Sequence, residues 1–246
     1  MMSFIEPIIL AVGAILLGAL TLWKRKSPTA LRDLPAFARL QRLLGLSVED
    51  GTRLHVSLGS ASLLDRRGGS ALAGLSMLRH VAERTSVSDT PPVASAGDPV
   101  LGLLSQDTLQ AGYKAAGAEG QYSQNTGRVA GLTPFGYAAG AMHISPTENV
   151  SVNILLGHFG PEAGLIADAA ERGNTALVGA SDNLAGQATL FASAQEALIG
   201  EELFAAGAYL GAGASHAASL TLQDILRWLV ILSLLAGAVL KFLRLI

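Results

Sequence analysis

Two long apolar segments, one at each end of the 246-residue chain, constrain its fold most strongly. Residues 4–23 consist almost entirely of Ile, Leu, Ala, Val and Gly, and residues 226–243 form a second apolar segment. A helix needs about 20 apolar residues to cross roughly 30 Å of hydrocarbon. We therefore expect a transmembrane helix at each end and the lipid bilayer as a partner. For the second segment, a helix that lies in the membrane interface is the alternative.

Positive charges near the first segment indicate which way the chain is oriented. A cleaved signal peptide carries cations before its apolar core, whereas here residues 1–6 have none and Lys24, Arg25 and Lys26 follow the core. The positive-inside rule places the segment after these cations in the cytoplasm. Lys241 and Arg244 would then lie outside, which the same rule disfavours, but the first helix usually sets the orientation. The expected location is the bacterial cell membrane, with a cytoplasmic middle domain.

The segment that follows the first span is amphipathic. Phe37, Leu40 and Leu44 recur at helical spacing. Their face could lie on the membrane while Arg39 and Arg42 contact anionic head groups, or it could pack on the domain. The expected division of the chain is residues 1–26 for the first span, 27–50 for the amphipathic linker, 51–222 for the middle domain and 223–246 for the second span.

Strand and helix patterns alternate through the middle domain. Strands are expected at residues 53–58, 93–96, 150–156, 176–179 and 187–192. Residues 137–144 also resemble a strand, which could pair with residues 150–156 in a hairpin, and residues 117–134 read as a long loop or lid. Helices are expected from Ser70, from Asp98 and from Gly160, and a last helix from Ser193 to Leu210. This alternation predicts an α/β fold: a layered domain with a largely parallel sheet.

Composition excludes several classes of function. The net charge of −2 provides no basic field for nucleic acid. The absence of cysteine removes disulfides, thiol catalysis and Cys-ligated metals. The five histidines show no pair with the spacing of a helical metal site, and G-x-S-x-G and P-loop motifs are missing. We expect no metal and no cofactor.

The best candidate site lies where an expected strand passes into a helix. Gly157, His158, Gly160 and Glu162 occupy this position. The N–H groups of a helix start attract anions, and open α/β sheets bind ligands beyond the carboxyl ends of their strands. A tight turn with structural glycines is the alternative.

The next expected strand ends in a similar way. Ser181 and Asp182, followed by Asn183, could face the same crevice, although Asp182 could equally be a turn or cap residue.

Three short segments carry a resemblance. They are Leu54–Gly59, Leu104–Thr108 and Gly179–Asn183. Together they resemble an uncharacterised family of membrane proteins from filamentous phototroph-type bacteria. The resemblance implies membrane helices at both ends and a bacterial origin, and it brings no activity and no site residues.

Two functions follow from these patterns. The first is a membrane-anchored structural or assembly protein, because the sparsely charged segment 196–210 would bury Leu198, Leu203 or Ala206 against a second copy in a homo-oligomer. The second is a membrane-bound enzyme, or a module that binds a small anion or nucleotide in the crevice near Gly157 and Asp182. A small molecule in the purified protein would favour the second.

Overall fold

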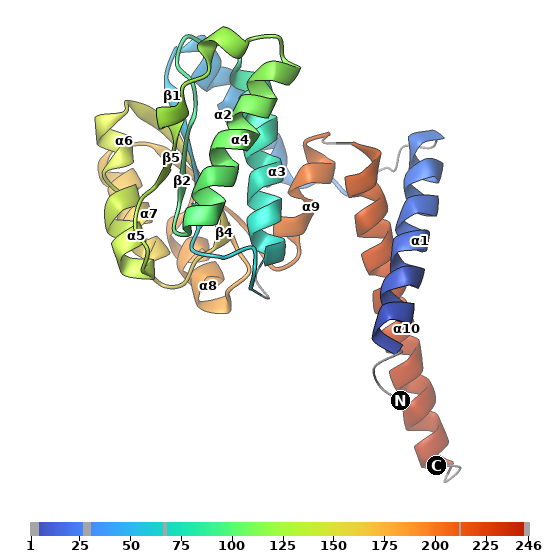
Figure 1. Ribbon diagram of the computed structural model, residues 1–246. Coiled ribbons are helices and arrows are strands. Elements are labelled where there is room, and N and C mark those ends of the chain that lie inside the picture. The colour runs from blue at the N-terminus through green and yellow to red at the C-terminus, as the bar shows by residue number, and fades with distance from the viewer. Residues whose placement is uncertain (1–4, 27–30, 66–67, 212, 244–246) are drawn as a thin grey trace. The chain divides into compact units, whose positions relative to one another are not determined.

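The computed structural model describes residues 5–26, 31–65, 68–211 and 213–243 (Figure 1). The chain divides into two compact units, residues 1–32 with 211–246, and residues 33–210. The first unit contains a pair of apolar helices, and the second is an α/β domain.

The helix pair consists of α1 (Ile5–Lys26) and α10 (Ala214–Phe242), which pack side by side. Their directions are opposite, so the amino end of α1 and the carboxyl end of α10 lie at the same end of the pair (Figure 1). Both helices are long and apolar enough to cross a membrane. With 29 residues, α10 begins well before the expected Leu226 and spans about 44 Å, more than the hydrocarbon thickness.

The α/β domain is built on a six-stranded parallel sheet in the order β3-β2-β1-β4-β5-β6. The strands are β1 (Arg53–Gly59), β2 (Val93–Ala96), β3 (Gly127–Val129), β4 (Val150–His158), β5 (Ala176–Ser181) and β6 (Glu196–Leu198). This confirms the predicted α/β fold with its parallel sheet. The order reverses between β1 and β4, as in doubly wound folds.

Helices cover both faces of the sheet (Figure 1). One face packs against α2 (Pro35–Glu49), α3 (Gly68–Thr85), α4 (Pro99–Ala115) and α9 (Glu202–Tyr209). The other packs against α5 (Pro134–Ala141), α7 (Ala163–Arg172) and α8 (Leu184–Ser193), with α6 (Ile144–Thr147) alongside β4. Two short 3-10 helices, η2 (Glu119–Gln121) and η3 (Gln124–Thr126), precede β3.

Helix α2 packs its apolar face on the α/β domain. Phe37, Leu40 and Leu44 are buried in the core, and the Phe37 ring stacks on Tyr209 with centroids 4.5 Å apart. Arg39 Nη1 lies 3.1 Å from Glu196 Oε1. Of the two alternatives for this amphipathic segment, the structure therefore shows the one in which it contacts the domain.

The expected hairpin is wrong, because residues 137–141 belong to α5 and residue 144, after a two-residue turn, begins α6. Thr133 caps α5 by accepting a hydrogen bond from Gly136 N at 3.2 Å, and Pro134 occupies its first turn. The Tyr, Ala and Gly residues that follow continue the helix that this cap begins, and they show no strand-like alternation. The expected loop at residues 117–134 also contains β3 at the edge of the sheet.

The carboxyl-terminal elements of the domain differ from expectation as well. Residues 187–192 lie in α8, which Asn183 caps through Ala185 N at 2.9 Å. Ser193 ends that helix, and β6 follows where a helix start was expected. Leu203 and Ala206 of α9 are 0% and 1% exposed, and Leu198 of β6 is 2% exposed. These three residues are core, so they do not face a second copy.

Candidate functional site

The candidate site lies at the carboxyl edge of the sheet, where the strand order reverses. Strands β1 and β4 are neighbours there, and Gly59 pairs with His158. Chains leave these two strands toward opposite faces of the sheet, which opens a crevice at such a point in doubly wound folds. The site is therefore built by the ends of β1, β4 and the neighbouring β5.

Glycines let the strand ends approach one another closely at this edge. Gly59 has a φ of +73°, and a Cβ there would lie 2.3 Å from His158 O. A Cβ at Gly157 would lie 2.0 Å from Leu58 O. Ser60 N then donates to His158 O at 3.0 Å. A side chain at either glycine would push β1 and β4 apart.

His158 and Asp182 form a pair at this edge. His158 Nδ1 lies 2.5 Å from Asp182 Oδ1, and the two side chains are 11% and 18% exposed. Within the described part of the chain, His158 Nε2 has no hydrogen-bond partner, and it is not among the fully enclosed polar atoms. This nitrogen remains available to a ligand.

The chemistry of this pair follows from the position of its carboxylate. A carboxylate on Nδ1 fixes the orientation and tautomer of an imidazole, so that Nε2 accepts a hydrogen bond when the ring is neutral and donates when it is charged. Such a pair can take up or release a proton on a bound molecule.

Ser181 holds the strand ends together. Its hydroxyl accepts hydrogen bonds from Phe159 N and Asn183 N, both at 3.1 Å, and donates to Phe159 O at 2.8 Å. These three bonds use the capacity of a hydroxyl. Ser181 is fully buried and therefore positions the loops after β4 and β5.

Glu162 lies directly before α7, whose first N–H groups already bond to the carbonyls of Gly160 and Pro161. Glu162 is 4% exposed, and its Oε1 accepts a hydrogen bond from Gly160 N at 2.7 Å. A second negative charge beside this buried carboxylate would be repelled. The structure therefore brings the predicted residues together, but it leaves only His158 and Asp182 with groups that face a ligand.

A buried polar layer lies beneath the site, between the sheet and α5. The Tyr137 hydroxyl lies 2.5 Å from Ser57 Oγ and 3.0 Å from Ser95 Oγ, and accepts from Gly59 N at 3.3 Å. His55 bridges Ser95 Oγ at 2.8 Å and Asn153 Oδ1 at 2.9 Å. The layer thus reaches Gly59, at the carboxyl end of β1.

Burial controls the protonation of this layer. Full burial lowers the pKa of His55 to about 4, so its ring is neutral at physiological pH. Burial also raises the pKa of Tyr137, which keeps its hydroxyl protonated. The layer therefore carries no net charge and supports the site as a fixed hydrogen-bonded array.

Comparison with protein families matches residues 2–246 to a domain of unknown function, DUF6754. The chain belongs to the DUF6754 family. Neither the curated proteins nor the solved structures give a match. The match confirms the expectation of a family without an assigned activity, so the function of this family member must be argued from its geometry.

The sequence patterns did not identify every residue of this site. Ser60 and the polar layer of His55, Ser57, Ser95 and Tyr137 were not singled out. One signal was present: His55 and Ser57 alternate with Leu54, Val56 and Leu58 along a strand that is buried on both faces. Polar residues at alternate positions of a central strand indicate a buried polar face.

Proposed function

We propose that this DUF6754 member is an integral membrane protein whose α/β domain binds a small polar molecule at the carboxyl edge of β1 and β4. The observation that carries the proposal is the His158–Asp182 pair beside the reversal in strand order. The free Nε2 of His158 makes the central contact and can exchange a proton with the ligand. This is a binding or enzymatic role in place of a purely structural one.

The ligand is a hydroxyl-bearing molecule. Glu162 and Asp182 place carboxylates near the crevice, and their negative charge opposes a phosphate at this position. A neutral imidazole nitrogen and a carboxylate both accept hydrogen bonds from hydroxyl groups. A ribose, which doubly wound sheets hold next to the reversal in strand order, has this chemistry.

Adenosine and NADH are suitable probes because both carry a ribose, and only NADH carries phosphates. The full chain is purified in mild detergent, screened by native mass spectrometry for a co-purifying molecule, and titrated with each probe. We expect saturable binding of adenosine and weaker binding of NADH, because the carboxylates of Glu162 and Asp182 oppose its phosphates. His158→Gln or Asp182→Asn should weaken adenosine binding about tenfold, the effect of losing one hydrogen bond.

His143→Gln is the matched control, because His143 is exposed and, among the described residues, its side chain bonds only to Ala139 O, at 2.7 Å. It should bind as the wild type does. If neither probe binds and nothing co-purifies, or if His158→Gln binds equally well, the proposed site is wrong.

Membrane anchoring and a cytoplasmic domain are part of the proposal. Two helices that are long and apolar enough to span a bilayer support the anchoring, and Lys24, Arg25 and Lys26 at the end of α1 support the cytoplasmic side. The bacterial origin rests on the sequence resemblance alone.

The cytoplasmic side can be tested because the chain has no cysteine. Gln124→Cys introduces an exposed thiol in the domain. An impermeant maleimide should label it only after the cells are lysed. Labelling in intact cells would show that the domain lies outside the cell, opposite to the proposed orientation.

Self-association is a second candidate, and the exposed face of α8 favours it. Leu184 and Phe191 are 81% and 73% exposed and lie seven residues apart, with exposed Ala188 between them. Apolar side chains at this helical spacing form one stripe. Because tethering to a bilayer raises the effective concentration, a stripe of this kind can support a homo-oligomer.

A further inference from the structure

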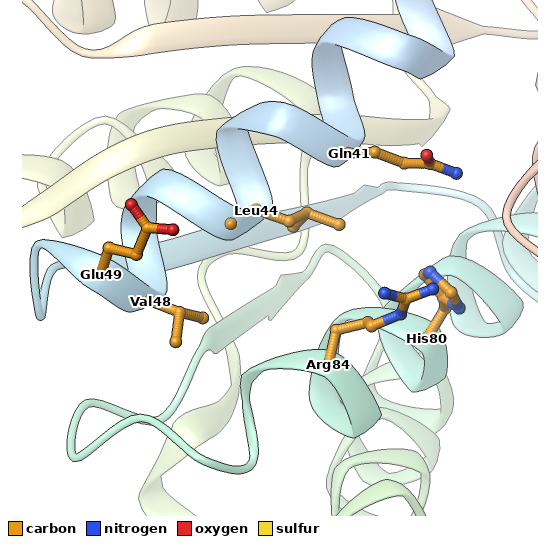
Figure 2. Close-up of a pocket in the computed structure, with 7 residues that line it drawn as sticks. Gln41, Leu44, Val48, Glu49, His80 and Arg84 are labelled. Carbon is orange, nitrogen blue, oxygen red and sulfur yellow. The ribbon is translucent and has the colours of Figure 1, made fainter.

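A cavity lies between α2 and α3 (Figure 2), and neither His158 nor Asp182 lines it. Its volume is about 240 Å³. Helices α2 and α3 end at Glu49 and Thr85, shortly before β1 and β2 begin. The cavity residues belong to the later turns of both helices and therefore lie toward the amino edge of the sheet, opposite the edge that carries His158.

His80 projects from α3 into this cavity (Figure 2). It is only 8% exposed, and neither of its ring nitrogens forms a hydrogen bond with a described residue. Burial, and then the nearby Arg84 guanidinium, lower the pKa of His80, so the ring is neutral at neutral pH. Neither ring nitrogen is among the fully enclosed polar atoms, so the one donor and one acceptor of the neutral imidazole can reach a ligand in the cavity.

Arg84 lies one turn further along α3 and completes the polar side of the cavity. Its side chain is exposed, and it makes no ion pair with any residue in the described ranges. Figure 2 shows Arg84 and His80 projecting from α3 toward α2, with Gln41 projecting from α2 above them. A cation beside a free imidazole N–H is suited to a carboxylate.

The opposite wall, formed by α2, has an apolar part between Gln41 and Glu49. Leu44 and Val48 of α2 line the cavity, and Gly45 between them has no side chain to fill it. A Cβ at Gly45 would meet nothing within 4 Å. An apolar group can therefore lie against α2 while a charged group contacts Arg84.

We propose that this cavity binds a small monocarboxylic acid, with the carboxylate on Arg84 and His80 and the apolar chain along Leu44 and Val48. Glu49 also lines the cavity, and its negative charge disfavours a second carboxylate on the ligand. The volume is below the roughly 300–1,000 Å³ of pockets for drug-sized ligands, which restricts the ligand to a short acid. This site is independent of the proposed ligand at His158.

Hexanoate is the probe, and methyl hexanoate is the neutral analogue that keeps the apolar chain. Binding to the full chain in mild detergent is measured by saturation-transfer NMR. We expect saturable binding of hexanoate and none of the ester. Arg84→Gln should weaken hexanoate binding at least about tenfold through loss of a charge-assisted contact.

Two further variants separate the cavity from nonspecific effects. Gly45→Leu should abolish binding by filling the cavity, and it should leave the domain folded because no atom lies within 4 Å of a Cβ at this exposed position. Arg79→Gln is the control, since Arg79 pairs with Glu83 on the same helix and does not line the cavity.

Three results would overturn the proposal. One is the absence of saturable hexanoate binding to the wild type, and another is equal binding of the ester. The third is unchanged binding in both Gly45→Leu and Arg84→Gln.

Discussion

The two faces of the central strand β1 differ sharply in chemistry although both are fully buried. Leu54, Val56 and Leu58 point into an apolar layer that includes α3 and α4. His55 and Ser57 point to the other face and join the polar layer beneath α5. The apolar layer contributes stability through burial, whereas the polar layer restricts which arrangement of strand ends is allowed, because every member needs a partner.

The largest expected difference between the two faces is in stability. Leu58→Ala should lower the free energy of unfolding by about 2–5 kcal/mol, since it leaves a cavity in the apolar layer. Ser57→Ala, one residue earlier, should cost about 1 kcal/mol through loss of one hydrogen bond. Urea unfolding of the domain in the detergent-solubilised chain measures both. Equal losses for the two variants would contradict the proposed division.

The polar layer should also make stability depend on pH. The folded pKa of His55, about 4, lies below its ordinary value of 6.5, so only the unfolded chain takes up this proton as the pH falls between these values. The contribution of His55 is therefore complete above pH 6.5 and is lost toward pH 4, by on the order of 3 kcal/mol. Unfolding curves at several pH values measure the slope.

His55→Gln is the control for this pH dependence, because it removes the titrating group while keeping a polar side chain. Burial lowers the pKa of His80 too, so some acid sensitivity remains in the variant. The slope should nevertheless become smaller. An unchanged slope would show that His55 is not the source.

A smaller effect should connect the polar layer to the candidate site. Tyr137→Phe removes the hydroxyl that bonds Ser57, Ser95 and Gly59 N, which should cost about 1–2 kcal/mol. Because Gly59 pairs with His158, binding of adenosine or NADH should weaken as well. Phe135→Leu, at an exposed residue of the same helix, should change neither quantity. If Tyr137→Phe lowers the free energy of unfolding but binds the probes normally, the layer has a structural role only.

The smallest effect on stability is expected at the surface. Phe191→Lys on α8 should change the free energy of unfolding by less than about 0.5 kcal/mol, because the side chain is 73% exposed. If the stripe on α8 forms a subunit contact, the variant should nevertheless reduce the mass of the detergent-solubilised complex. Glu171→Lys, at an exposed residue of α7, is a charge control. A wild type that is monomeric at all concentrations would exclude self-association.

Long or strongly marked elements could be predicted from the sequence, and short ones could not. The cap at Asp98, which accepts from Leu101 N at 3.0 Å, and the alternation in β1 were both read correctly. Residues 137–144 and 187–192 were misread because short runs of Ala, Gly and aromatic residues fit helix and strand alike. The N-terminal caps at Thr133 and Asn183 mark the starts of helices α5 and α8, to which these segments contribute.

The candidate site was predicted in part. Gly157, His158 and Asp182 were named because parallel strands end at one edge, and β4 and β5 are indeed neighbours. The roles of Ser181 and Glu162 could not be assigned, since a hydroxyl or carboxylate that serves a loop looks the same in sequence as one that binds a ligand. Their hydrogen bonds to Phe159 and Gly160 show that both side chains hold the loop after β4.

The sequence by itself determined the two apolar helices, the α/β class and the parallel sheet, because hydropathy, capping and alternation are local properties of the chain. Only the tertiary structure decided that β1 lies beside β4, that Leu203 and Ala206 are core, and that His80 faces a cavity with Arg84. These facts depend on contacts between residues far apart in sequence. The residues next to a side chain in the sequence do not identify the residues that it contacts in space. A sparsely charged helix can therefore belong equally to a core or to a subunit interface.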